Sequence, residues 1–396
     1  MQPELIADCV HCGFCLPSCP TYTLWHEEMD SPRGRIHLMG GLVDGSIPLT
    51  DTVAEHFDRC LGCMACVPAC PSGVKYDRLI EQTRDYVEEH HRRPAGERLL
   101  RGLIFSVFPH RRRLRAALAL RRLPAPGPFR PLAAVAPPWL SPAWPPEHLP
   151  GPGPRVALLA GCVQSVVFGD VNAATARVLA ADGYDVHVPR TQGCCGALHA
   201  HAGRSPEGAT RARELERVLD GFDYVVTNAA GCGSHLKEHG GRNVVDVSEL
   251  LGNPVMVGKA NTAQAERHPL RLNVAFQDSC HLKHAQRVEA EPRAALAQIP
   301  GLTVLEPAEQ EICCGSAGLY NLVQPEAARE LGRRKAGHVL ATEPDAYASG
   351  NPGCLLQVTA ALRSAGRPLP AFHPIELIDA SIRGVEPADL LAHARR

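Results

Sequence analysis

The sequence predicts an α+β multidomain protein, in which a compact helical unit is followed by a duplicated α/β region. Three observations lead to this prediction. Two dense cysteine groups lie within the first seventy residues, prolines recur from Pro124 to Pro154, and the rest of the chain repeats the same landmarks twice. At 396 residues the chain is too long for one hydrophobic core, and its content of 45% hydrophobic and 21% charged residues is typical of folded proteins.

The totals of charged residues and cysteines narrow the class of protein. Because 41 basic residues nearly balance 42 acidic ones, the whole chain gives no reason to expect nucleic acid as a partner. Sixteen cysteines without a signal-peptide pattern at the start argue against a secreted, disulfide-linked protein and favour metal binding. Apolar runs fall short of the roughly 18 residues that a transmembrane helix needs. We therefore expect a cytoplasmic protein without a transmembrane segment.

Residues 1–90 are expected to form the helical unit, with helices near residues 35–43 and 76–90. The cysteine groups within it read C-x2-C-x2-C-x3-C-P from Cys9 and again from Cys60. This is the run found in two-cluster ferredoxins, where the fourth cysteine of each group ligates the other cluster. The predicted ligands are therefore Cys9, Cys12, Cys15 and Cys70 for one [4Fe–4S] cluster (cluster one), and Cys60, Cys63, Cys66 and Cys19 for the other (cluster two).

Zinc is the structural alternative for these groups, because paired C-x2-C units also bind Zn²⁺. A zinc site requires neither the third cysteine spacing nor the proline that both groups carry, so the pattern favours iron and sulfur. Between the groups, Ser31-Pro-Arg-Gly-Arg35 opens a predicted helix. Its arginines could face a cluster or lie at the surface, and the sequence does not separate the two.

Residues 91–123 are predicted to form a basic helical segment. Eleven arginines and a single acid, Glu97, lie between residues 90 and 130, in patterns that suit an amphipathic helix. We expect a solvated helix face, with docking to an acidic partner or to an anionic membrane surface as the alternatives. The second alternative would place the protein peripherally on the inner face of the cell membrane. The prolines of residues 124–154 exclude helix and central strand, which predicts an extended linker.

Residues 155–260 and 270–390 are predicted to be two copies of one α/β unit. In both, short strand-like apolar runs alternate with glycine and cysteine turns and with helical segments. Four landmarks recur in the same order and at nearly constant spacing, a drift that loop insertions can absorb. They are Cys162 and Cys280, Cys194-Cys195-Gly and Cys313-Cys314-Gly, Cys232 and Cys354, and Glu249 and Glu376.

The eight cysteines of the two copies are candidate metal ligands. Each follows a predicted strand, and the carboxyl ends of parallel strands meet at one edge of a sheet. Four thiolates gathered there could hold a further iron–sulfur cluster or a zinc ion, and His235 adds a fifth donor in the first copy. The alternative is buried free cysteine in tight glycine turns. The candidates are Cys162, Cys194, Cys195 and Cys232 in the first copy, and Cys280, Cys313, Cys314 and Cys354 in the second.

Nucleotide-binding motifs are missing from the sequence. It contains no Gly-x-Gly-x-x-Gly turn after a strand, no phosphate-binding Gly-Lys-Ser/Thr loop and no Gly-x-Ser-x-Gly elbow. The chain therefore gives no sign of binding its own flavin or nicotinamide. A carrier of single electrons without a two-electron cofactor must receive its electrons from a partner.

Two ferredoxin-type groups followed by two Cys-Cys-Gly (CCG) repeats resemble the iron–sulfur subunit of bacterial glycolate oxidase over essentially the whole chain. The resemblance implies an electron-transfer subunit that is not catalytic alone. An FAD-containing subunit would oxidise glycolate to glyoxylate, and the quinone pool would be the acceptor. It also implies that the eight N-terminal cysteines are the cluster ligands. The stretches that carry it are residues 9–15, 31–36, 70–74, 277–286 and 313–321.

Two related families offer alternatives. Similar iron–sulfur subunits serve dehydrogenases of D-lactate and other 2-hydroxy acids, so the resemblance leaves the substrate open. The CCG repeats also look like those of heterodisulfide reductase, which would imply a thiol/disulfide oxidoreductase acting at Cys313 and Cys314. That family usually ends each repeat with C-x2-C, whereas His235 and Gln357 stand at the corresponding positions here.

Overall fold

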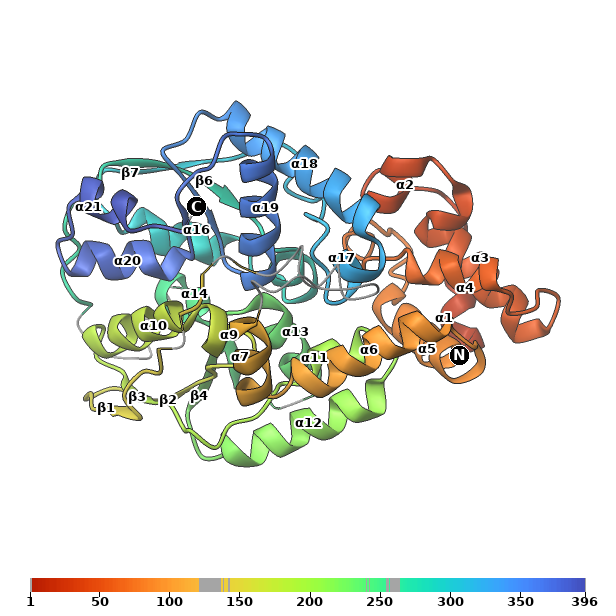
Figure 1. The fold of residues 1–396 in the computed structure, drawn as a ribbon, viewed down its shortest axis with the longest axis horizontal. Coiled ribbons are helices and arrows are strands. Elements are labelled where there is room, and N and C mark those ends of the chain that lie inside the picture. The colour runs from red at the N-terminus through yellow and green to blue at the C-terminus, as the bar shows by residue number, and fades with distance from the viewer. Residues whose placement is uncertain are drawn as a thin grey trace.

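The structure is a computed structural model. It describes residues 2–395 apart from residues 121–136, 138, 142, 240, 242, 254–255 and 257–263. A helical N-terminal unit lies at one end of the molecule, and two α/β units lie beside each other at the other end (Figure 1). The predicted α+β fold class, with a helical unit before a duplicated α/β region, is confirmed.

The N-terminal unit is built from short helices around an apolar core that contains Met39, Phe57, Leu79 and Ile80. The helices expected near residues 35–43 and 76–90 are both present. The Ser31 hydroxyl caps the first of them by accepting a hydrogen bond from the Gly34 amide, with Pro32 at the first helical position. The elements are α1 (Pro3–Ala7), α2 (Pro20–Trp25), η1 (Glu28–Asp30), α3 (Pro32–Asp44), α4 (Asp51–Asp58) and α5 (Tyr76–His90).

The first α/β unit contains a sheet of order β1-β3-β2-β4-β5. All neighbouring strands are parallel except β1 and β3. The strands are β1 (His148–Leu149), β2 (Arg155–Leu158), β3 (Asp185–His187), β4 (Tyr224–Thr227) and β5 (Val244–Asp246). The helices are α9 (Gln164–Val167), α10 (Gly169–Ala181), α11 (Ala197–Ala200), α12 (Ser205–Val218), α13 (Ala230–His239) and α14 (Val247–Gly252).

The second α/β unit has a parallel sheet of order β7-β6-β8-β9, which repeats the β3-β2-β4-β5 order of the first unit. The two units pack through α14 against α16 and α10 against α20. The strands are β6 (Leu272–Gln277), β7 (Leu302–Leu305), β8 (Ala346–Ser349) and β9 (Ala371–Phe372). The helical elements are η3 (His281–Ala285), α16 (Ala290–Ala297), α17 (Tyr320–Val323), α18 (Pro325–Ala341), α19 (Pro352–Ser364), α20 (Pro374–Ile382) and α21 (Pro387–Ala392).

The basic segment is helical, with one face exposed to solvent and the other face buried. It forms two helices, α6 (Ala95–Val107) and α7 (Arg111–Ala119). Ile104 of α6 packs in one apolar cluster with Leu319 of the second α/β unit. Just before α6, the buried Arg93 guanidinium pairs with Asp58 at 2.6 Å. This part of the segment is therefore buried structure that joins the N-terminal unit to the rest of the molecule.

The proline-rich stretch is only partly described, since residues 124–136, 138 and 142 lie outside the described residues. Its last part contains β1, an edge strand, which agrees with the exclusion of helix and central strand. Trp139 and Trp144 pack against the main apolar core. This part therefore belongs to the first α/β unit, and the boundaries of the linker stay a prediction. None of the helices in the described part of the chain is long and apolar enough to cross a membrane.

Candidate iron–sulfur centres

Two cavities in the N-terminal unit are lined by the cysteines of the ferredoxin-type groups. The first is bordered by Cys9, Cys12, Cys15, Cys66 and Cys70, and the second by Cys19, Cys60, Cys63 and Cys66. Cys66 borders both cavities. Without Cys66 the first cavity still has four cysteines, whereas the second would have only three. The cysteines thus gather as the crossed ligand sets require. Four or more cysteine thiols around each cavity suit iron–sulfur clusters or zinc, and not hard cations.

Matching backbone turns shape the two cysteine loops. The second residue after Cys9 and the second after Cys60 both have positive φ, at His11 (54°) and Gly62 (63°). The fourth residues after Cys9 and Cys60 also have positive φ, at Gly13 (87°) and Met64 (62°). Non-glycine residues with positive φ are uncommon, so two equivalent turns indicate that the loops coil in the same way. Cysteines three residues apart are thereby turned toward one side of each loop.

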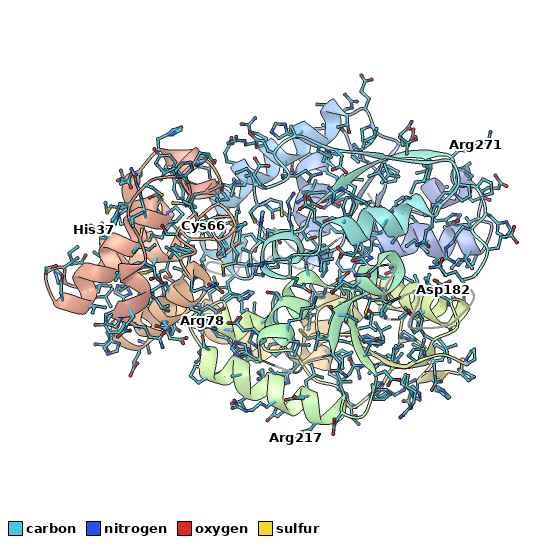
Figure 2. The ribbon with its side chains drawn as sticks, turned by 180° about the vertical axis from the view of Figure 1, so that it is seen from behind. His37, Cys66, Arg78, Asp182, Arg217 and Arg271 are labelled. Carbon is cyan, nitrogen blue, oxygen red and sulfur yellow. The ribbon has the colours of Figure 1, made fainter. Side chains whose placement is uncertain are left out.

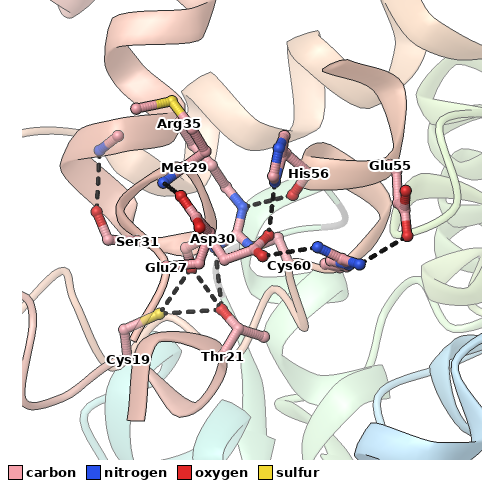
Figure 3. A network of polar contacts seen from close by, with 12 residues as sticks. Cys19, Thr21, Glu27, Met29, Asp30, Ser31, Arg35, Glu55, His56 and Cys60 are labelled. Carbon is pink, nitrogen blue, oxygen red and sulfur yellow. Dashed lines mark hydrogen bonds and ion pairs between the residues drawn. The ribbon is translucent and has the colours of Figure 1, made fainter. Parts of the chain in front are cut away.

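A buried ion-pair network lies beside Cys19, the cysteine that is predicted to cross to cluster two (Figure 3). The Asp30 carboxylate is fully buried and pairs with Arg35 at 3.2 Å, Arg59 at 2.9 Å and His56 at 3.0 Å. Arg35 also donates to the Thr21 hydroxyl at 3.1 Å, and this hydroxyl lies 3.3 Å from the Cys19 sulfur. The network therefore fixes Cys19 through Thr21.

The two arginines that the sequence could not separate have different surroundings. Arg35 is buried and borders the cavity of cluster two. Arg33 is partly exposed, pairs with Glu28 at 2.7 Å and donates to the His11 carbonyl at 2.9 Å, at the rim of the cavity of cluster one. The sequence analysis did not identify Asp30. The feature of the sequence that could have indicated it is its position immediately before Ser31, which caps α3.

Burial and nearby cations set the pKa values of the thiols. Burial raises the pKa of Cys15 to about 11 and raises the pKa of Cys63 and Cys66 well above their usual range. Burial also acts to raise the pKa of Cys60, but the charges of Arg35 and Arg84 outweigh it and lower this pKa. Metal binding must therefore displace protons from most of these thiols. The cations beside Cys60 favour the negative charge of a thiolate-ligated cluster.

The four cysteines of the first CCG repeat meet at the carboxyl ends of β2, β3 and β4. The Cys162 thiol donates to the Cys194 sulfur at 3.6 Å. Hydrogen bonds from Cys162 and Cys195 lower the pKa of Cys194, and a further hydrogen bond links Cys195 to Cys232. His235 is buried three residues after Cys232, and burial lowers its pKa to about 4. Its imidazole is therefore neutral at physiological pH, and its role as a fifth donor stays a prediction.

The second CCG repeat gathers its cysteines in the same way, and Nδ1 of His281 lies 3.6 Å from the Cys280 sulfur. The sulfurs of Cys280 and Cys313 lie 3.9 Å apart, and Cys314 is hydrogen-bonded to both Cys313 and Cys354. The Gln357 amide, at the position equivalent to His235, donates to the Ala328 carbonyl at 2.7 Å. Either repeat could hold a metal with four thiolates, and metal binding there stays a prediction.

The second CCG repeat packs directly on the loop of cluster two. Cys63 shares one apolar cluster with Leu61, Cys313 and Tyr320. Burial is the largest cause of the raised pKa of Cys63, and the nearby Cys313 thiol is the second largest. Figure 2 shows Cys66 within the N-terminal unit, at the end turned toward the α/β units.

Family models match the chain in three segments. A 4Fe-4S dicluster domain matches residues 5–74, and a cysteine-rich domain, CCG, matches residues 156–237 and 274–359. These matches confirm the predicted iron–sulfur cofactors and the duplication. The crystal structure of a hypothetical protein from Helicobacter pylori is similar in fold, with a TM-score of 0.56 at 10% identity over 92% of this chain and 70% of that one.

Curated relatives extend the similarity to the whole chain. The probable glycolate oxidase iron-sulfur subunit of Bacillus subtilis is 35% identical over 100% of this chain and 95% of its own length. The glycolate oxidase iron-sulfur subunit of Escherichia coli is 34% identical over 96% and 95%. Lactate utilization protein A of Oceanobacillus iheyensis is 24% identical over 58% of this chain and 98% of its own length. The chain therefore belongs to the family of glycolate oxidase iron–sulfur subunits.

Proposed function

We propose that the chain is the electron-transfer subunit of a glycolate-oxidising complex, which receives electrons from an FAD-containing subunit and passes them toward quinone. The observation that carries this proposal is the pair of thiolate-lined cavities in a chain that resembles glycolate oxidase iron–sulfur subunits along its whole length. When bound, each [4Fe–4S] cluster would accept and release one electron, so two clusters divide a two-electron oxidation into single steps.

The surface over cluster one is suited to the flavin partner. Cys12 is exposed, and both side chains that flank this loop, Val10 and Phe14, are 68% exposed. Large apolar side chains that project beside a redox site favour a protein partner that covers them. Electrons would enter the chain here.

Cluster two is the more enclosed of the two centres. Cys19, Cys60, Cys63 and Cys66 are all buried. The Tyr76 hydroxyl lies 3.6 Å from the Cys60 sulfur, and Arg35 supplies a buried positive charge. These groups would stabilise the reduced cluster and exclude water from it.

The basic helices support peripheral attachment to an anionic membrane, where quinone is found. Leu99 and Leu103 project from α6, and Leu120 follows α7, with exposures of 58%, 37% and 62%. Arg112 and Arg115 are exposed on α7. Apolar side chains next to arginines are typical of elements that lie on a membrane surface.

The proposal is tested by purifying the full chain anaerobically with its native partners and recording EPR spectra before and after substrate addition. We expect cluster signals that grow with glycolate and grow less with D-lactate. Signals that respond to D-lactate instead would assign the chain to a lactate dehydrogenase complex. Clusters that dithionite reduces but neither acid reduces would overturn the proposal.

A further inference from the structure

Two histidines and an aspartate gather on one face of the edge of the first sheet. His148 lies on β1 directly opposite His187 on β3, and Asp185 precedes His187 by two residues. Side chains two residues apart on a strand point to the same face, so the sheet register places all three together. A hydrogen bond from the Val188 amide to the Glu147 carbonyl, at 2.8 Å, holds the register at this end.

The Asp185 carboxylate lies against both imidazoles. Its Oδ1 is 2.6 Å from Nε2 of His148, and its Oδ2 is 3.0 Å from Nε2 of His187. The two rings stack, with centroids 4.3 Å apart and an interplanar angle of 19°. The donor atoms all lie within 4.8 Å of one another. The His148 side chain is 49% exposed, so the group is open to solvent on one side.

We propose that His148, Asp185 and His187 form a binding site for a divalent transition-metal ion of the zinc class. Two imidazoles and one carboxylate are ligands that Zn²⁺ binds at about 2.0–2.2 Å. Donors on a tetrahedral ion then lie roughly 3–3.5 Å apart, close to the spacing of each His–Asp pair, so small side-chain rotations suffice. Mg²⁺ and Ca²⁺ would require more oxygen ligands than the site offers. Three protein ligands leave the fourth position to water.

The surroundings are compatible with a cation. Phe222 packs against His187 at 5.1 Å and carries the Arg155 guanidinium on its ring. Nε of Arg155 is 3.9 Å from the Asp185 carboxylate. The Arg155 side chain is 56% exposed, so its guanidinium can turn toward solvent when a cation binds.

The ion would join β1 to β3. Because β1 has only two residues at the sheet edge, few backbone hydrogen bonds hold it. A metal ligated from both strands would cross-link the end of the proline-rich stretch to the first CCG repeat.

The test uses the full chain with its iron–sulfur clusters reconstituted and oxidised, and Zn²⁺ as the probe. Zinc is titrated anaerobically against a chromophoric chelator for the wild type, the double variant His148→Gln/His187→Gln, and His90→Gln as a control. His90 is a similarly exposed histidine, at 48%, on helix α5. We expect the wild type and the control to bind one zinc ion more than the double variant.

Zinc-edge X-ray absorption separates this site from zinc bound at cysteines, since the additional ion has only nitrogen and oxygen neighbours. The conservative variant Asp185→Asn should weaken zinc binding at least about tenfold and reduce the rise in melting temperature that zinc causes. This second readout covers the case in which the double variant fails to fold. Equal zinc binding by all variants, or additional zinc with sulfur neighbours only, would show that the three side chains are merely hydrogen-bonded.

Discussion

At the scale of single residues, the buried Asp30 carboxylate organises the surroundings of cluster two. Two arginines and His56 share this one carboxylate, and Arg35 extends the network to Thr21 and Cys19. A buried charge is tolerated only when it is paired and hydrogen-bonded. The network should therefore hold the crossed cysteine in place before a cluster is inserted.

Replacing Arg35 with methionine should reduce the free energy of unfolding by about 3 kcal/mol, because it removes one charge of a buried pair. Chemical denaturation followed by circular dichroism under anaerobic conditions measures this loss. The matched control is Arg33→Met on the same helix, whose pair with Glu28 is partly exposed and should contribute at most about 1 kcal/mol. Equal losses in the two variants would contradict the role assigned to the network.

The sequence could not separate these two arginines for a physical reason. Residues two positions apart on a helix point to nearly opposite sides, so only one of them can face the protein interior. Which one does so depends on how α3 packs against α4 and the cysteine loops. Local sequence carries no information on that packing. The cysteines themselves were predictable, since a loop that wraps a cubane requires their spacing.

At the scale of elements, the duplicated landmarks predicted the sheets well. Cys162 and Cys280 both follow the central strands β2 and β6, and the equivalent strand orders show that the repeats fold alike. Edge strand β1 was not predictable, because two residues give no periodicity and prolines surround them. The break between α6 and α7 carried a readable signal in Pro109, which cannot continue a helix without loss of a hydrogen bond.

Helix α7 supplies the prediction at this scale. The double variant Arg112→Glu/Arg115→Glu should bind vesicles that contain phosphatidylserine at least about tenfold more weakly than the wild type, since each basic residue contributes about 1 kcal/mol at an anionic surface. Co-sedimentation with vesicles measures the change. The control is Arg213→Glu/Arg217→Glu on the exposed face of α12. If both variants weaken binding equally, net charge and not α7 attracts the protein to the vesicles.

At the scale of the whole molecule, carboxylates face each other where the N-terminal unit meets the first repeat. Glu81 of α5 lies near Glu238 of α13. Burial is the main cause that raises the pKa of Glu81 to about 8, and the charge of Glu238 is the second. Asp77 and Asp85 act in the same direction, and Arg84 opposes them. The folded protein therefore holds a proton that the unfolded chain releases, and stability should fall as the pH rises from about 4.5 to about 8.

The variant Glu81→Gln should remove this loss. At pH 8.5 we expect it to be more stable than the wild type by up to about 5 kcal/mol, with little difference near pH 5. Denaturation curves at both pH values, in metal-free buffer, measure the difference. Glu89→Gln changes an exposed carboxylate on the same helix and serves as the control. If the free energy of unfolding changes with pH in the same way for Glu81→Gln and for the wild type, the interface does not hold a proton.

The two CCG repeats should differ in their influence on cluster two, although they share one fold. Cys313 packs against Cys63, whereas Arg84 links the cluster-two loop to the first repeat by donating to the His201 carbonyl at 2.9 Å. The second repeat therefore lies closer to the ligand Cys63 predicted for cluster two. Replacing Cys313 with serine should shift the midpoint potential of cluster two by roughly tens of millivolts, because it changes a polar group beside a ligand.

The matched variant Cys194→Ser, at the equivalent position of the first repeat, should leave the midpoint potential of cluster two unchanged. A redox titration followed by EPR, with the iron content of each variant measured in parallel, separates a shifted potential from a lost cluster. Equal shifts in both variants would mean that the cysteines act through the fold and not through contact with the cluster-two loop. A shift confined to Cys313→Ser would show that the second repeat tunes the potential of cluster two through its contact with Cys63.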